Sequence, residues 1–119
     1  MGPLLDSVSM ETDPQGWSPH EQTIARHAFD LAYGREIETL IHTLRYRCGS
    51  MGSVDAVWDL HDFLSGKRHE MDGRYDFRFA TLLFVFANLV KDGLLSLDEL
   101  EGLSSDKIAK ISAMSRMSI

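Results

Sequence analysis

The sequence predicts an all-helical protein, and three observations support the prediction. No proline occurs between Pro19 and Ile119, and proline inside a helix removes a hydrogen-bond donor and clashes with the preceding turn. Apolar residues recur at intervals of three and four, the spacing of the buried face of a helix. No segment alternates polar and apolar residues convincingly, so we expect no sheet.

The first helix is expected to begin directly after Ser18. Ser18, Pro19 and Glu21 supply an N-cap serine, a proline at the first helical position and the glutamate of a capping box. Apolar residues then follow at helical spacing. The GSMG turn at residues 49–52 should end this helix near Cys48.

Two further helices fill the middle of the chain. Ser53 can cap a second helix that runs to about Met71, with Gly73 at its end. A third helix fits residues 75–91, and Gly93 closes it. This third segment is apolar on nearly all sides, as a buried helix is.

The C-terminal part predicts two short helices. The sequence SLDE at residues 96–99 is a capping box that opens a helix ending at Gly102. Ser104 or Ser105 then begins a last helix, whose apolar residues are Ile108, Ile111 and Met114.

The length of 119 residues suits a single domain. Residues 1–16 contain glycine, proline and small polar residues without periodicity, so we expect a mobile tail followed by one helical domain over residues 17–119. Hydrophobic residues make up 44% of the chain and charged residues 25%. Both values are ordinary for a globular protein.

The net charge and the cysteine content argue against several classes of protein and of site. A net charge of −6 argues against nucleic-acid binding, which needs cations to displace counterions from phosphate. Cys48 is the single cysteine, so the chain has no internal disulfide or multi-cysteine zinc site, and a reducing, intracellular compartment fits best. No apolar run approaches the ~20 residues of a membrane span, and we see no signal peptide.

The second helix presents a candidate binding face. Its core side carries Leu60, Phe63, Leu64 and Met71, with Val57 at the border. The opposite side, over roughly 120° of arc, carries Trp58, His61, Asp62, Ser65, Arg68 and His69. Trp58 either packs under another element of its own chain or belongs to a surface that binds another protein. Because interface centres are rich in tryptophan and arginine, we favour the second interpretation.

Three other kinds of site fit this sequence less well. His69 lacks a second histidine one turn further on, as a zinc-protease helix requires, so we expect no metal. Ser65 lies on a helix with no nucleophile elbow or oxyanion donors, so we expect no catalytic residue. Residues 97–116 superficially resemble a helix-turn-helix, but four acidic residues near Lys107, Lys110 and Arg116 oppose DNA.

A long, ordered part of the chain resembles the fluorescence recovery proteins of cyanobacteria. The central signature is WDLHDFLSGKRHEMDGRYD at residues 58–76. The resemblance continues through LFVFA at 83–87, LVKDG at 89–93, LSLDELEGL at 95–103 and DKIAKI at 106–111. It extends over residues 17–117, and is therefore much more specific than a short motif.

The resemblance implies an elongated, all-helical homodimer with long N-terminal helices, a small C-terminal helical head, no cofactor and no catalysis. Such proteins bind the photoactivated, red form of the orange carotenoid protein, mainly through its C-terminal domain. They hasten its return to the orange form and help to detach it from the phycobilisome, which ends non-photochemical quenching. The implied location is cytoplasmic, peripheral to the thylakoid membrane through the phycobilisome-associated partner.

The resemblance also places the functional residues. It implies that the partner is bound by Trp58, His61, Asp62 and Arg68 in the second helix, and by Phe84 and Lys110 in the C-terminal head. For the dimer interface we expect the second helices to pair through Val57, Trp58 and His61, because these side chains exceed what one thin core can bury. A helical dimeric adaptor or chaperone-like protein for a different partner is the alternative.

Overall fold

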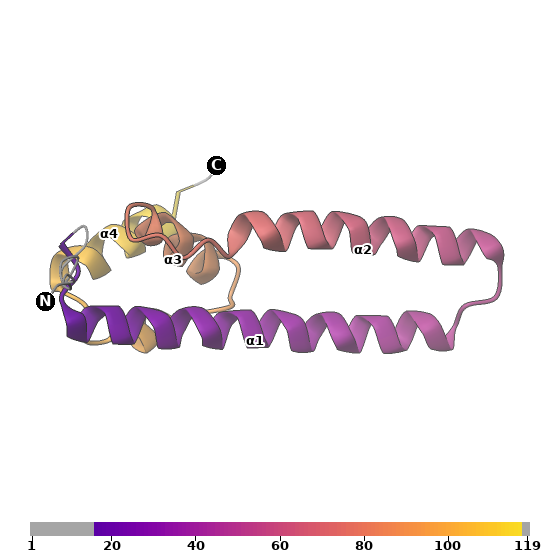
Figure 1. Ribbon diagram of the computed structural model, residues 1–119, viewed down its shortest axis with the longest axis horizontal. Helices are drawn as coiled ribbons and strands as arrows, with labels where there is room; N and C mark the ends of the chain where they lie inside the picture. Colours follow the sequence, from indigo (N-terminus) through magenta and orange to yellow (C-terminus); the bar gives the residue numbers. More distant parts are fainter. Residues whose placement is uncertain (1–15, 118–119) are drawn as a thin grey trace, which may run out of the picture.

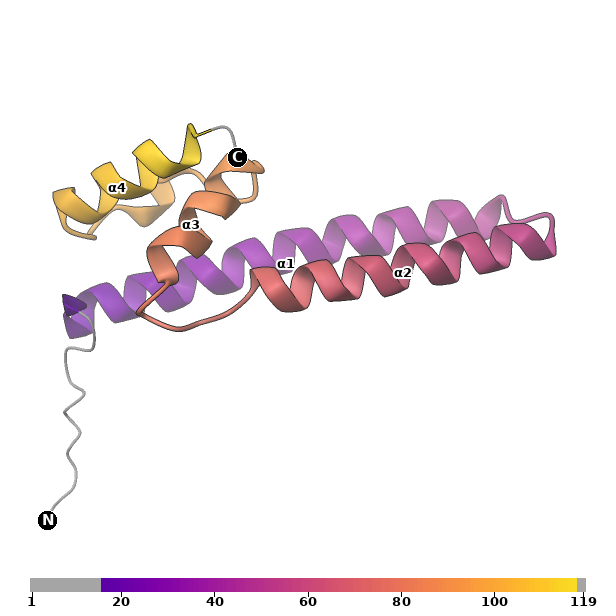
Figure 2. The same cartoon turned by 90° about the horizontal axis from the view of Figure 1, so that it is seen from above.

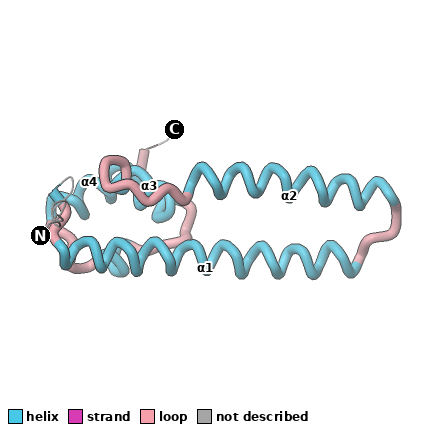
Figure 3. Tube along the Cα trace, in the orientation of Figure 1, coloured by secondary structure: helices cyan, strands magenta, loops and turns pink. Residues whose placement is uncertain are grey.

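The computed structural model describes residues 16–117, within which four α-helices and one 3-10 helix occur and no β-strand (Figure 3). The elements are α1 (Pro19–Gly49), α2 (Val54–Arg74), α3 (Leu82–Lys91), η3 (Leu97–Leu100) and α4 (Ser105–Ser115). The prediction of an all-helical fold is therefore confirmed. The tail predicted for residues 1–16 lies almost wholly outside the described residues, and the expectation of one domain over residues 17–119 stays a prediction.

Two regions share the long helix α1. Its C-terminal part and α2 run antiparallel as a hairpin, while α3, η3 and α4 gather beside its N-terminal part (Figures 1 and 2). We call residues 37–70 the arm, and residues 16–36 with 75–117 the head. The principal extents of 60 × 37 × 21 Å confirm the elongated shape.

The helices α1, α2 and η3 begin directly after the N-cap serines that the sequence predicts. The Ser18 hydroxyl accepts a hydrogen bond from the Glu21 amide at 3.1 Å, and the Glu21 carboxylate accepts one from the Ser18 amide at 3.1 Å. Ser53 accepts from the Ala56 amide in the same way. The predicted capping box at Ser96 and Glu99 is also present. These side chains satisfy amides that have no partner within the helix.

The third helix begins later than the sequence predicts, which corrects the expected range of residues 75–91. Tyr75 to Thr81 form turns and irregular chain, and the helix starts at Leu82. Phe77 contacts the Phe29 ring edge-on at 5.0 Å between centroids, and Phe79 lies 5.5 Å from Trp17. Aromatic side chains two positions apart face the same way in extended chain but not in a helix. Packing on α1 therefore overrides the local helical spacing.

Two smaller expectations about these helices are also wrong. α2 continues to Arg74 rather than ending near Met71, so Gly73 lies in its last turn. α3 is not buried all round: Leu82, Phe86 and Leu89 are buried, but Phe84 is 65% exposed. Gly93 does close α3, with a φ of 77°, a left-handed conformation that costs glycine little.

The hydrophobic core lies entirely in the head and at its junction with α2. Small residues on α1 let the other helices approach closely, and large side chains fill the remaining space. Gly102 illustrates this packing, because a Cβ there would collide with the end of Ile24. The core members are Trp17, Ala25, Ala28, Phe29, Ala32, Leu82, Phe86, Ala87, Leu89, Leu95, Leu100, Leu103 and Ile111.

Candidate protein-binding site

The outer face of α2 is open to solvent, and no other described part of the chain covers Trp58. Its side chain is 60% exposed, and its nearest ring is His61, edge-on at 6.2 Å. His61 in turn contacts the Asp62 carboxylate at 3.3 Å, and both side chains are largely exposed. The interpretation that Trp58 packs under another element of its own chain is therefore wrong for the residues described here.

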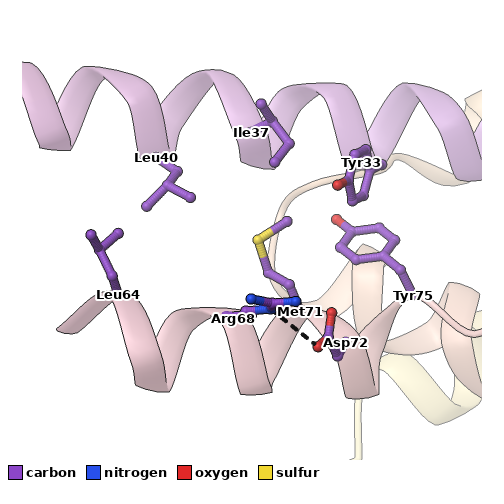
Figure 4. Close-up of a pocket in the computed structure, with 8 residues that line it drawn as sticks. All are labelled: Tyr33, Ile37, Leu40, Leu64, Arg68, Met71, Asp72 and Tyr75. Carbon is purple, nitrogen blue, oxygen red and sulfur yellow. Dashed lines mark ion pairs between the residues drawn. The ribbon is translucent and has the colours of Figure 1, made fainter. Parts of the chain in front are cut away.

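A groove of about 720 Å³ runs between α1 and α2 beside this face. Figure 4 shows Leu40 and Leu64 pointing toward each other from the two helices, with Tyr33 and Tyr75 at one end. Ile37, Met71, Asp72 and Arg68 complete the lining. The groove is thus apolar at its centre with one ion pair at the rim.

Arg68 is the exposed cation at the rim of this groove. Its side chain is 86% exposed, and its Nε lies 3.9 Å from the Asp72 carboxylate. An exposed pair at that distance contributes little to folding. The guanidinium can therefore turn to a carboxylate of another protein, to which arginine binds through two parallel hydrogen bonds.

Phe84 and Lys110 are separated from the other four predicted residues. Phe84 lies on α3, where it shares a groove of about 490 Å³ with Glu70, Gly73 and Arg74 at the end of α2. Lys110 lies on α4, where its Nζ pairs with Asp106 at 3.2 Å. The predicted residues thus divide into an arm set on α2 and a head set on α3 and α4. Their roles stay predictions.

A buried charge cluster lies where arm and head meet. Glu36, with its side chain only 6% exposed, accepts hydrogen bonds from Lys67 at 2.6 Å and from the Tyr75 hydroxyl at 2.7 Å. Arg74 lies 3.7 Å from the same carboxylate. Burial opposes ionisation of Glu36, but these donors outweigh it and hold its pKa below the usual value. Burial and the hydrogen bond to Glu36 raise the pKa of Tyr75.

Two more carboxylates join the helices of the head. Arg35 donates two hydrogen bonds to Glu99, at 2.8 and 2.6 Å, and these bonds lower the pKa of Glu99 to about 2. Glu21 accepts from the Ser104 amide at 2.7 Å and from Lys107 at 3.1 Å. Burial opposes ionisation of Glu21, but these bonds lower its pKa. Each pair links α1 to an element more than 60 residues further along the chain.

Sequence reasoning missed the groove and the charge cluster. One signal could have indicated the cluster: Glu36 follows Phe29 and Ala32 at helical spacing, so it occupies a core position of α1. A carboxylate at such a position needs a buried cation or donor. The groove residues Tyr33, Ile37 and Leu40 share a helix face, but nothing in the sequence says that this face stays uncovered.

Residues 16–117 show neither a metal-binding cluster nor a spanning segment. They contain no group of three or more histidine, cysteine or acidic side chains placed to hold a metal ion. None of their helices is long and apolar enough to cross a membrane.

Exposed aromatic, charged and groove-lining residues on a helical hairpin define a class: small helical proteins with a surface suited to binding another protein. The family model for the photoprotection regulator fluorescence recovery protein matches residues 17–115. The chain therefore belongs to the fluorescence recovery protein family, and it is a photoprotection regulator by membership.

Individual relatives agree with this assignment. The fluorescence recovery protein of Synechocystis sp. PCC 6803 is 43% identical over 108 residues, which cover 91% of this chain and 99% of the relative. The solved structure of the Fremyella diplosiphon protein is 50% identical with a TM-score of 0.83, covering 85% of this chain and 99% of that one. The Synechocystis structure has the same TM-score and coverage at 44% identity.

Proposed function

We propose that this chain is a non-enzymatic homodimer that binds the photoactivated orange carotenoid protein, mainly its C-terminal domain. It accelerates return of the red form to the orange form and helps to detach it from the phycobilisome. Non-photochemical quenching then ends and antenna fluorescence recovers. The protein acts in the cytoplasm, at the thylakoid surface when its partner is bound to the phycobilisome.

The observation that supports binding is the uncovered face of α2. Trp58, His61, Asp62 and Arg68 are all exposed, although tryptophan normally finds cover. Their side chains have no geometry suited to metal binding or nucleophilic catalysis. A tryptophan beside paired charges is instead typical of the energetic centre of a protein interface.

The dimer is supported by the poor burial of the arm. No residue from Ile37 to Glu70 is buried, although α1 and α2 carry apolar side chains throughout this range. Helices in proteins gain most of their stability from packing an apolar face, and this hairpin leaves much of that face open. A second copy that pairs through Val57, Trp58 and His61 would cover the exposed Val57 and Trp58 side chains.

The proposed action needs no bond chemistry. A binder speeds a conformational change only if it binds the transition state more tightly than the starting state. One surface on the arm and one on the head could hold two domains of the photoreceptor in the geometry through which they reassociate. Charged residues such as Asp62 and Arg68 would set orientation and register.

A reversion assay tests the proposal. The photoreceptor is converted to its red form by light, and its return is followed by absorbance in the dark with substoichiometric amounts of this chain. We expect faster reversion, and a complex on size-exclusion chromatography with the isolated C-terminal domain. An unchanged rate with several photoreceptors, and no complex, would instead favour a dimeric adaptor for a different partner.

A further inference from the structure

Ion pairs link the C-terminal end of α2 to α1 and to the end of α3. The Arg74 side chain is only 10% exposed, and its Nη1 lies 2.9 Å from the Asp92 carboxylate at the end of α3. Its Nη2 donates to Glu70 at 2.9 Å, and its Nε lies 3.7 Å from Glu36 on α1. One guanidinium therefore contacts three helices at the boundary between arm and head.

These contacts differ from those of Arg35. Both Arg35 bonds to Glu99 are hydrogen bonds, which fix distance and direction together. Arg74 makes its single aligned hydrogen bond to Glu70 in its own helix, whereas its buried Nε and Nη1 make none. The links from α2 to α1 and α3 through Arg74 therefore rest on charge alone, and removing one charge should loosen them.

Asp92 is unfavourably placed except for this contact. It caps the C-terminal end of α3, where the helix dipole disfavours a negative charge. Arg74 supplies the compensating positive charge at 2.9 Å. Asp92 therefore joins the end of α3 to the end of α2 through its ion pair with Arg74, which we call the clamp.

We propose that Arg74, clamped by Asp92, is a positioning residue that sets the spacing between the arm set and the head set of partner-binding residues. The arm set lies on α2, whose other contacts leave residues 54–70 unburied. Phe84 of the head set lines the same groove as Arg74. A shift of the α2 end would therefore move Arg68 and Trp58 relative to Phe84. The effect on binding rests on the proposed function, but the spacing itself does not.

Spin-label distances test the spacing directly. In a Cys48→Ser background, labels at Ser65→Cys on α2 and Ala113→Cys on α4 occupy exposed positions outside both sets. A large excess of unlabelled chain restricts the signal to distances within one protomer. We expect one narrow distance for the unmodified junction, and a clearly broader or shifted distribution for Asp92→Asn.

Two variants separate the clamp from general effects. Asp98→Asn changes the net charge equally at an exposed position in the same head, and should keep the narrow distance. Asp92→Glu keeps the negative charge and should largely restore the narrow distance distribution. Circular dichroism checks that each variant is folded. Arg74→Gln, which removes the positive charge at this junction, replaces Asp92→Asn if that variant unfolds.

Binding to the photoreceptor C-terminal domain gives the second readout. A residue that acts without touching the partner changes affinity by roughly two- to thirtyfold, and we expect a loss in that range for Asp92→Asn. An unchanged distance distribution in Asp92→Asn and Arg74→Gln overturns the proposal, as does a broadened distribution with unchanged affinity. If the unmodified chain itself fails to bind, the proposed function is wrong, while the distances still decide whether Arg74 sets the spacing.

Discussion

The head and the arm use the same kind of helix in opposite ways. In the head, α1 is covered by α3, η3 and α4, and residues such as Phe86, Leu100 and Ile111 are fully buried. In the arm, α1 has only α2 beside it, and no residue from 37 to 70 is buried. The buried core of the described residues thus lies in the head, and the proposed dimer and partner would supply the cover that the arm lacks. Low burial therefore coincides with the region that carries four of the six proposed partner-binding residues.

The largest expected effect is a loss of stability when a core residue of the head is truncated. Phe86→Ala removes a fully buried ring, and such truncations cost about 3–5 kcal/mol of unfolding free energy. In a Val57→Glu background, which we expect to be monomeric, Leu64→Ala in the arm should cost only about 1 kcal/mol, because Leu64 is half-buried within one chain. Urea unfolding of the two variants measures the contrast. Equal losses would mean that the arm has a core of its own.

The next largest effect concerns the dimer. Val57→Glu should convert the protein to monomers, because it places an unpaired charge in a contact that excludes water, at a cost of about 3–5 kcal/mol. Light scattering at micromolar concentration measures the mass. Thr39→Glu adds the same charge at an exposed position outside the groove and should leave the dimer intact. A monomer already in the unmodified chain would refute the paired second helices.

These two predictions show where sequence reasoning succeeds and where it stops. Ser18 and Ser53 identify helix starts because a cap is a local interaction. The sequence misplaces the start of α3, because Phe77 and Phe79 pack on Phe29 and Trp17, about 50 residues or more away in the chain. Local spacing carries no information about such contacts. The sequence indicates the exposed face of α2, because Trp58 lies among charged residues on that face. It does not indicate the groove, because the groove depends on how α1 and α2 pack against each other.

A smaller effect separates binding from folding. Arg68→Leu should lose partner binding by about tenfold or more, as buried arginine anchors at interfaces do. Its melting temperature should stay within a few degrees, because Arg68 is exposed and its pair with Asp72 is long. Arg45→Leu, at another exposed arginine of the arm, is the matched control. Unfolding of Arg68→Leu would make Arg68 a structural residue.

The smallest effect concerns pH and belongs to the head. The two hydrogen bonds from Arg35 lower the pKa of Glu99 to about 2 from an ordinary 4.5. Its contribution to stability is therefore complete above about pH 4.5, and it is lost as the pH falls toward 2. Melting temperatures between pH 6 and pH 2 should fall less steeply for Glu99→Gln than for Glu38→Gln, an exposed control. Parallel curves would mean that the pair adds no pH-dependent stability.

Hydrogen–deuterium exchange tests the contrast between arm and head most directly. At concentrations low enough to dissociate a dimer, amides of residues 37–70 should exchange much faster than those of α3 and α4. Raising the protein concentration should slow exchange in the arm, and adding the photoreceptor C-terminal domain should slow it further around Trp58 and Arg68. Uniform protection of arm and head at every concentration, unchanged by the partner, would contradict the claim that the arm is completed by other proteins.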